Sequence, residues 1–375
     1  MQSMHCHSDR GVSRSNRPGF QSVPRVSLGM STGRRILAVS AVLAAVVVLA
    51  ASPAGATTSG RDGRIAYKHF FDVGFARAAI FTANPDGSEV RQVTHPAANT
   101  VDDFPQWSPG GSRLVFTRFS PGADRCYTVL ANGMDQTHVA GTAVFSVDPP
   151  SGIGCEFASF APDGKHLALS LASGGLVEQP TEHIARLGIY VSDAKGNHLR
   201  QLTQFGQTTT SEDHEPAWSP DGQRIVFTRI NTVAAPVNQQ ALFIMDANGG
   251  NIRRITPWSL NAGGADWSPD GSEIAFQSYR DCACTVTSQI FIVHTDGTDL
   301  DQITTNGRNI EPSFSPSGND LVFGHNPGTG SNGFADIDTL NIDETASHLL
   351  KIIHTPMWES EPAWGTAPLL DQSSS

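Results

Sequence analysis

The sequence predicts an all-β fold, a six-bladed β-propeller of four-stranded antiparallel blades. Three observations lead to this expectation. An aromatic residue followed by a Pro-x-Gly turn recurs along the chain, each copy precedes short segments typical of strands, and the two ends of the repeat region each hold part of one unit. A repeat of about 50 residues is typical of radial arrays in which each unit contributes one small sheet.

The recurring motif marks the first hairpin of each unit. Successive aromatic positions are 53, 58, 49, 47 and 50 residues apart. Proline fixes φ and glycine tolerates positive φ, so each copy predicts a tight turn between two strands. The copies are Trp107-Ser-Pro-Gly-Gly111, Phe160-Ala-Pro-Asp-Gly164, Trp218-Ser-Pro-Asp-Gly222, Trp267-Ser-Pro-Asp-Gly271 and Phe314-Ser-Pro-Ser-Gly318, with a shortened sixth at Trp364-Gly365.

The unit from Glu215 to Thr256 shows the expected strands most clearly. Glu215-Pro-Ala-Trp218 is the first strand, and Arg224–Arg229 and Leu242–Met245 are rich in β-branched and aromatic residues. Asp246-Ala-Asn-Gly249 then turns the chain into Ile252–Ile255, the fourth strand. Such a sheet has two apolar faces and is stable only when it stacks on neighbouring sheets.

The other units follow the same plan, and the ends predict how the array closes. Residues 63–94 supply the last three strands of a unit, whereas Glu361-Pro-Ala-Trp364 is a first strand with nothing after it. We therefore expect the C-terminal strand to join the N-terminal blade and to close a ring of six. The second and third strands of the complete units are expected at 114–116 with 127–130, 167–169 with 189–191, 274–276 with 290–293, and 321–323 with 338–342.

Residues 1–56 have the features of a cleaved signal peptide. Arg34-Arg35 precedes an apolar run from Ile36 to Ala51, and Ala54-Gly55-Ala56 resembles a cleavage site. The run of 16 residues is shorter than the roughly 20 that span a membrane. Met30 is an alternative start, an uncleaved anchor is an alternative fate, and the arginine pair leaves both Sec and twin-arginine export open.

The remaining chain is predicted to be one propeller at 57–366 and a disordered tail at 367–375. The leader holds 6 of the 25 basic and 1 of the 36 acidic residues, which leaves 19 against 35 and a net charge near −16. Such a surface repels nucleic acid and anionic membranes. We expect a secreted or otherwise extracytoplasmic monomer that binds no nucleic acid and inserts in no membrane after cleavage.

Four cysteines follow the leader, in a compartment where disulfides persist. Cys126 and Cys155 flank one connection between repeats and are predicted to be bonded. Cys282 and Cys284 are predicted to form a local bridge. Two cysteines with no second Cys or His pair at the usual spacing do not predict a zinc site.

The repeats resemble those of TolB-type propellers. The resemblance rests on Glu-Pro-Ala-Trp-Ser-Pro-Asp-Gly at 215–222, on the Ile-x-Phe strand and the Ile-x-Val-x-Asp-x-x-Gly hairpin, and on the closing Gln201-Leu-Thr203 and Gln302-Ile-Thr304. It covers almost all of residues 60–366 and implies the propeller fold. Such repeats occur in partner-binding periplasmic proteins, in peptidases and in polysaccharide-degrading enzymes, so the resemblance leaves function open. Only a few residues separate the cleavage site from Gly63, so we expect the amino-terminal domain of TolB to be lacking.

Alternating strand direction places the long, dissimilar connections on one face, which we call the loop face, and the tight turns on the opposite turn face. Binding residues concentrate on variable loops held by a rigid scaffold. We therefore expect function on the loop face and around its channel mouth. The connections are 68–78, 172–187, 230–240, 278–288 and 324–334 within units, and 139–155 and 204–214 between units.

Carboxylates gather where the first strands begin, at the same mouth. They suit a cation or basic partner, or acid–base chemistry on a sugar. If the hairpins pair symmetrically, however, Asp102 faces Arg118 and Asp213 faces Arg229 in structural ion pairs of roughly 0.2 to 1 kcal/mol each. The residues are Asp102, Asp103, Glu156, Asp213, Glu215, Glu311, Glu359 and Glu361.

Glu215, Glu311 and Glu361 lie three residues before the aromatic and have no such partner in the sequence, so with His214 they are the candidate ligand-binding residues. His69, His214 and His325 fall at strand ends on the loop face and are the candidates for a shared divalent metal. No cofactor is otherwise expected.

The sequence shows no Gly-x-Ser-x-Gly elbow, His-Glu-x-x-His helix or phosphate loop. We therefore favour a secreted, non-catalytic propeller that binds a protein, peptide or glycan at the loop face and channel mouth. The alternative is a metal-assisted carbohydrate-active hydrolase or lyase. Convergence of the three histidines with Glu215 or Glu361 would favour the enzyme.

Overall fold

The computed structural model describes residues 59–121, 123–139, 146–147, 150–151, 153–173, 186–203, 211–231, 239–279, 287–328, 335–342 and 349–370. Regular structure in these residues is β-strand except for the 3-10 helix Trp258–Leu260. None of the helical structure in them is long and apolar enough to cross a bilayer. The expected signal peptide and most of the long loops lie outside the described residues.

Four consecutive stretches of the chain each form one four-stranded antiparallel sheet with strands in sequence order, as predicted. The strands are β10 (Ile153–Phe160), β11 (His166–Ser173), β12 (Arg186–Asp193) and β13 (Arg200–Gln201); β14 (Ser211–Trp218), β15 (Arg224–Asn231), β16 (Gln239–Asp246) and β17 (Arg253–Arg254); β18 (Ala262–Trp267), β19 (Glu273–Ser278), β20 (Gln289–His294) and β21 (Asp301–Gln302); and β22 (Arg308–Phe314), β23 (Asp320–Asn326), β24 (Asp336–Asn341) and β25 (Leu350–Ile353).

The remaining strands form a larger sheet of two such groups joined by one parallel bridge, between Ala78 and Val101. In the first group β26 pairs antiparallel with β1, with Trp364 opposite Ile65. A strand near the C-terminus thus completes the sheet of the first described strands. The groups are β26 (Glu359–Trp364), β1 (Ile65–Phe70), β2 (Ala78–Ala83) and β3 (Arg91–Gln92), and β4 (Val101–Trp107), β5 (Arg113–Ser120), β6 (Ala123–Leu130) and β7 (Thr137–His138); β8 (Ser146–Val147) and β9 (Pro150–Ser151) form a separate short hairpin.

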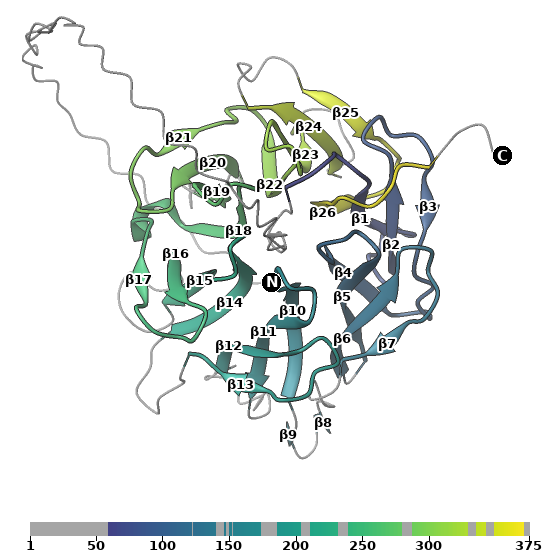
Figure 1. The fold of residues 1–375 in the computed structure, drawn as a ribbon. Helices are drawn as coiled ribbons and strands as arrows, with labels where there is room; N and C mark the ends of the chain where they lie inside the picture. The colour runs from purple at the N-terminus through teal and green to yellow at the C-terminus, as the bar shows by residue number, and fades with distance from the viewer. Residues whose placement is uncertain are drawn as a thin grey trace, which may run out of the picture. The chain divides into compact units, whose positions relative to one another are not determined.

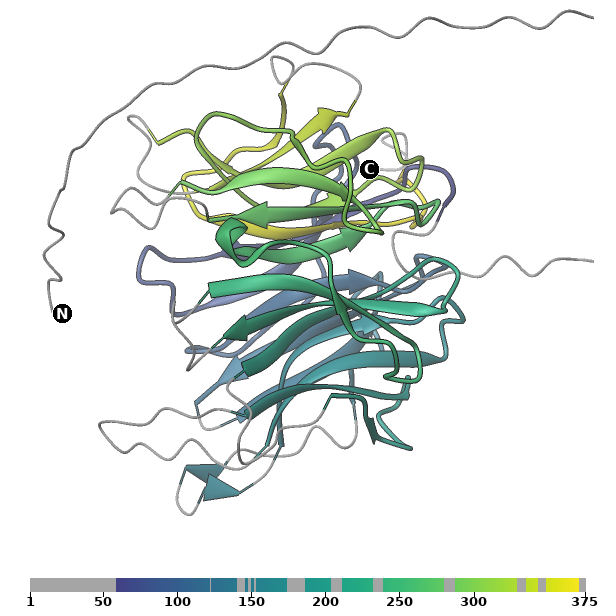
Figure 2. The ribbon, with the colours of Figure 1, turned by 90° about the vertical axis from the view of Figure 1, so that its left-hand side faces the viewer.

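The first strands of successive groups are neighbours. β4 contacts β10, β10 contacts β14, and the series continues through β18 and β22 to β26, which contacts β4. Figure 1 shows these strands nearest a common centre, with the two-residue strands β13, β17 and β21 at the periphery. Figure 2 shows the sheets stacked beside one another when seen from the side.

The Pro-x-Gly motifs form the expected tight turns between first and second strands. In the copy after Trp218, the amide of Gly222 donates to the carbonyl of Ser219 at 2.9 Å, and Gly222 has a φ of 67°. The Asp221 carboxylate accepts from the Ser219 hydroxyl at 2.5 Å and from the Gln223 amide at 2.9 Å. These bonds fix the register of the hairpin. The ends of the two strands that lie away from the turn are therefore on the loop face.

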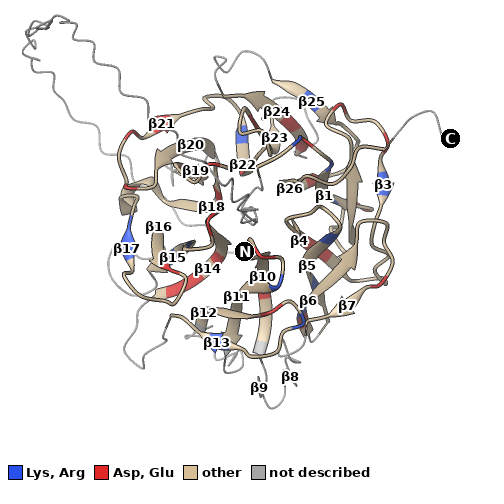
Figure 3. Cartoon of the chain, in the orientation of Figure 1, with Lys and Arg blue, Asp and Glu red and all other residues tan. Residues whose placement is uncertain are grey.

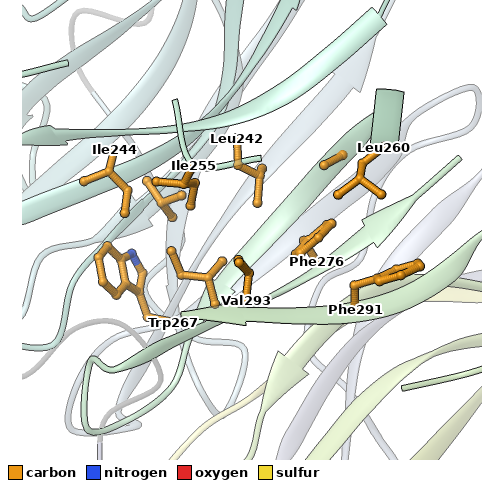
Figure 4. Packing of buried hydrophobic residues seen from close by; sticks show 11 residues of the cluster. Leu242, Ile244, Ile255, Leu260, Trp267, Phe276, Phe291 and Val293 are labelled. Carbon is orange, nitrogen blue, oxygen red and sulfur yellow. The ribbon is translucent and has the colours of Figure 1, made fainter. Parts of the chain in front are cut away.

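The hydrophobic core lies between adjacent sheets. Phe276 and Phe291 of one sheet pack with Leu242 and Ile244 of the preceding sheet (Figure 4). The motif tryptophan Trp267 is fully buried in this cluster, and its indole donates to the carbonyl of Ala217 in the preceding sheet at 3.0 Å. The aromatic position of the repeat therefore joins neighbouring sheets, as expected for a stacked array.

The described chain continues past residue 366, the predicted end of the propeller. Ala367 is 1% exposed, and its carbonyl accepts from the amide of Arg64 at 3.0 Å. The amide of Leu370 donates to the side chain of Asn84 at 3.2 Å. Residues 367–370 are therefore held against the first strands, whereas the sequence assigned them to a disordered tail.

A disulfide joins Cys126 of β6 to Cys155 of β10, the pair expected from the sequence, with Cα atoms 5.6 Å apart. It connects two neighbouring sheets across a connection that lies largely outside the described residues. Cys282 and Cys284 also lie outside them, so their predicted bridge stays a prediction.

Replacing Cys126 and Cys155 together by alanine should lower the free energy of unfolding by about 2 to 4 kcal/mol, because the bond closes a loop with a sequence separation of 29. Chemical denaturation measures the loss, and peptide mapping of the unreduced protein identifies the linked cysteines. A Cys282→Ala/Cys284→Ala protein is the control and should retain the linkage. A link from Cys126 to any residue other than Cys155 would contradict the assignment.

Candidate functional site

A β-bulge interrupts the pairing of each innermost strand near the centre. The register shifts between Asp103 and Gln106 in β4 and between His214 and Ala217 in β14, and corresponding shifts occur in the other first strands. Four bulged side chains adopt positive φ: Phe104 at 50°, Glu215 at 49°, Glu311 at 54° and Glu361 at 50°. Gly264, at the same position in β18, has a φ of 61°.

Positive φ is uncommon for bulky residues and costs of order 1 to 3 kcal/mol at each position, so the surrounding structure must impose it. The bulged residues Phe104, Glu215, Gly264, Glu311 and Glu361 all line one narrow cavity of about 50 Å³. The repeated bulge therefore brings equivalent positions of different sheets to one place.

Lys68 of β1 is the central cation of this region. Its ammonium lies 2.8 Å from Asp103 and 2.5 Å from Glu361, and its side chain is 7% exposed. The same ammonium lies 5.2 Å from the ring centroid of Phe70 and 5.9 Å from that of Phe104. Burial opposes the charge, but the carboxylates outweigh it and raise the pKa of Lys68. The sequence suggested no partner for Glu361, and the structure supplies one.

Glu311 has the least stabilised charge of the group. Burial, followed by the nearby Glu361 carboxylate, raises the pKa of Glu311 well above its ordinary value. Its Oε2 is buried and has no hydrogen-bond partner among the described residues. Burial and Glu361 also raise the pKa of Asp103, against the opposing effect of Lys68. The inner site therefore holds more carboxyl groups than Lys68 can neutralise.

Glu215 connects two sheets. Its Oε2 accepts a hydrogen bond from the Thr228 hydroxyl at 3.0 Å and another from the Gly264 amide at 2.9 Å. Within the described chain both bonds involve the same oxygen, which leaves Oε1 available to a ligand. Acidic segments, including those of β14, appear in red around the centre in Figure 3.

His214 lies next to Glu215 and bridges two further carboxylates. Its Nδ1 is 3.2 Å from Glu156 and its Nε2 is 3.4 Å from Glu212. Burial opposes protonation, but hydrogen bonds to these acids and the nearby charge of Glu215 raise the pKa of His214 to about 10. Asp124, whose pKa is raised to about 6 by burial and by Glu156, adds another acid.

A cavity of about 300 Å³ lies at this mouth and combines aromatic and acidic groups. The ring centroid of Phe104 is 5.6 Å from that of Phe157 and 6.4 Å from that of Phe119. Phe104, Phe157 and Glu215 also line the narrower central cavity, so the two spaces share part of their wall. We call the larger space the mouth pocket; its lining is Phe104, Phe119, Glu156, Phe157, His214 and Glu215.

Two of the predicted acids are structural. Asp102 lies opposite Arg118, with Nε–Oδ1 and Nη2–Oδ2 distances of 2.5 and 2.7 Å. Asp213 lies opposite Arg229, with corresponding distances of 2.6 and 2.8 Å. Both predicted cross-strand pairs are confirmed, and they leave neither acid available for a ligand.

The three histidines proposed for a shared metal have separate partners. His69 lies 2.8 Å from the buried Glu359, and His325 lies 2.6 Å from the Asn309 carboxamide. His214 contacts Glu156 and Glu212, as described above. Among the residues that the structure describes, no group of three or more His, Cys, Asp or Glu side chains is arranged to hold a metal ion.

A larger cavity, of about 680 Å³, lies on the turn face. It is lined mainly by turn residues such as Pro109 and Pro162, and two of its charged residues, Arg113 and Asp135, pair with each other at 2.8 Å. The mouth pocket is the better candidate because its half-buried carboxylates lie beside an aromatic wall.

Sequence reasoning identified Glu215, Glu311, Glu361 and His214, which the structure places at the mouth pocket or the adjoining cavity. It missed Lys68 and the three phenylalanines. Two of these phenylalanines could have been found from their position, because Phe104 and Phe157 lie three residues before the repeat aromatic, as Glu215 does.

Comparisons with known proteins agree with the architecture. Residues 229–365 match the family model of the TolB beta propeller domain. TolB from Acinetobacter baumannii has a similar structure, with a TM-score of 0.62, 19% identity, and coverage of 82% of this chain and 67% of that chain.

Two other structures carry the same fold. A chain of a nidogen/laminin complex has a TM-score of 0.55 at 10% identity, covering 82% of this chain and 100% of that chain. An oligogalacturonate lyase in complex with manganese has a TM-score of 0.52 at 13% identity, covering 81% and 78% of the two chains. At these identities the similarities establish the fold alone.

Replacing Lys68 by methionine should lower the free energy of unfolding by about 3 to 5 kcal/mol, because Asp103 and Glu361 would lose their buried cation. Chemical denaturation measures the change. Lys165→Met removes an exposed lysine and should stay within about 0.5 kcal/mol of wild type. Equal effects of the two substitutions would contradict a buried role for Lys68.

The stabilising effect of His214 should depend on pH. Its folded pKa of about 10 exceeds the unfolded value of about 6.5, so its contribution is fully present below the unfolded pKa and declines as pH rises through the folded one. The difference in the free energy of unfolding between wild type and His214→Gln should therefore shrink as the pH rises from about 6.5 to 10. His95→Gln removes an exposed histidine and should show no such convergence.

Proposed function

Since the chain has a TolB-like β-propeller fold, we propose that it is a non-catalytic binding scaffold that takes a protein, peptide or glycan ligand at the channel mouth of its loop face. The mouth pocket is the observation that carries this proposal, because it combines aromatic rings with half-buried polar groups. Binding pockets have this composition, with volumes of roughly 300 to 1,000 Å³.

We further propose that the sheets form a closed ring of six blades, counting β26 with β1, β2 and β3 as one blade. The pairing of β26 with β1 and the contact of β26 with β4 support closure. A closed ring leaves only short, protected strand edges at its centre and holds the mouth residues of different sheets at fixed distances.

An extracytoplasmic location fits this role. The order of charged, apolar and small residues in 1–56 supports export, and the Cys126–Cys155 bond suits an oxidising compartment. A protein-binding role is consistent with the similarity to a chain of a nidogen/laminin complex, and we propose that this chain acts as a monomer.

A metal-assisted carbohydrate-active hydrolase or lyase is the second candidate, because the fold is shared with an oligogalacturonate lyase in complex with manganese. Two observations favour the binding scaffold. The described residues hold no group suited to a metal ion, and the acidic mouth would repel a polyanionic uronic acid chain.

A thermal-shift screen against peptides, neutral oligosaccharides, oligogalacturonate and divalent metals separates the two proposals. We expect peptide or neutral glycan ligands to raise Tm, and the shift to fall in Glu215→Ala but not in Glu273→Ala, which removes a carboxylate outside the mouth pocket. The binding-scaffold proposal would be contradicted if a metal raised Tm, if His214→Ala or Glu215→Ala abolished that rise, and if the protein turned over a saccharide.

A further inference from the structure

The mouth pocket has the composition of a site for an organic cation. Glu156 and Glu215 provide negative charge, and Phe104, Phe119 and Phe157 provide aromatic faces and edges. Ammonium and guanidinium groups are attracted both to carboxylates and to aromatic faces, and the attraction grows when water is excluded. A neutral ligand would use only part of this chemistry.

The protein already contains one example of such binding. The Lys68 ammonium contacts Asp103 and Glu361 and lies near the rings of Phe70 and Phe104. Phe104 also lines the mouth pocket, where Glu215 is the bulged acid at the position that Glu361 holds in its own strand. Lys68 satisfies Glu361, but within the described residues no lysine or arginine forms an ion pair with Glu215.

The charges of the region favour an added cation. Among the described residues, Glu156, Glu212 and Glu215 surround one cation, His214, and the adjoining cavity contains Glu311, whose buried Oε2 has no hydrogen-bond partner there. Neighbouring carboxylates that are partly removed from water repel one another unless a cation or a proton neutralises them. A ligand ammonium would supply the missing partner.

We propose that the mouth pocket binds a lysine or arginine side chain of an extended peptide segment, with its cationic head at Glu215 and its apolar stem against Phe104 and Phe157. This inference rests on the proposed function and names the chemistry of its ligand. A cavity of about 300 Å³ has room for one long side chain, and the shared wall with the central cavity directs the head toward the inner carboxylates.

Isothermal titration calorimetry with short matched peptides tests the proposal. The probes are acetyl-Gly-X-Gly-amide, where X is lysine, arginine or the neutral isostere norleucine, together with spermidine. The lysine and arginine peptides should bind purified protein at least about tenfold more tightly than the norleucine peptide, the equivalent of one charge-assisted contact. This comparison needs no variant.

Variants then locate the binding. Glu215→Gln should reduce the preference for lysine over norleucine to less than about twofold. Glu273→Gln makes the same change of charge outside the pocket and should preserve the preference. Phe157→Leu should weaken the lysine peptide more than the norleucine peptide, because it removes an aromatic face but retains an apolar wall.

The outcomes separate this inference from the proposed function. Equal affinity of the lysine and norleucine peptides, or a preference unchanged by Glu215→Gln, overturns the cation pocket. If a glycan nevertheless binds and Glu215→Ala weakens it, the binding scaffold stands while this inference fails. Binding of spermidine without binding of either basic peptide overturns the assignment of the cation to a peptide.

Discussion

The bulge in the innermost strands is the constraint on which the central site depends. Regular pairing would alternate side chains between the two faces of a sheet. The bulge instead adds a residue at positive φ, and Phe104, Glu215, Gly264, Glu311 and Glu361 share this conformation and line one cavity. Only one of these residues is glycine, so at the other four positions the backbone is strained and a side chain reaches the cavity.

The sheets have similar backbones because of the repeat, but they differ in how their acidic side chains are neutralised. Asp103 and Glu361 are paired with the lysine of β1, whereas Glu156 and Glu212 near β14 share one protonated histidine. A group of like charges that is partly removed from water destabilises the folded state unless a cation or a proton neutralises it. The acids near β14 come closest to this arrangement, so a cationic ligand bound beside them would increase the stability of the folded protein.

The sequence predicted what is local or periodic. Hairpin turns follow from Pro-x-Gly, and counting outward from the turn correctly paired Asp102 with Arg118 and Asp213 with Arg229. It could not predict that Lys68 meets Glu361, because that contact joins strands from opposite ends of the chain and depends on how sheets pack. The bulge also escaped prediction, since glutamate and phenylalanine before proline carry no signal for positive φ. The burial of the Glu311 carboxyl oxygen could not be predicted either, because it depends on how the sheets pack.

The pairing of β1 with β26 also constrains the order in which the molecule can assemble. A chain emerging from a ribosome presents residues 65–70 long before residues 359–364. Until then β1 keeps an unpaired edge and Lys68 lacks Glu361, one of its two carboxylate partners. Folding intermediates should therefore expose an unpaired strand edge until residues 359–364 emerge, and chaperones that shield such edges would be needed most for the sheet that contains β1.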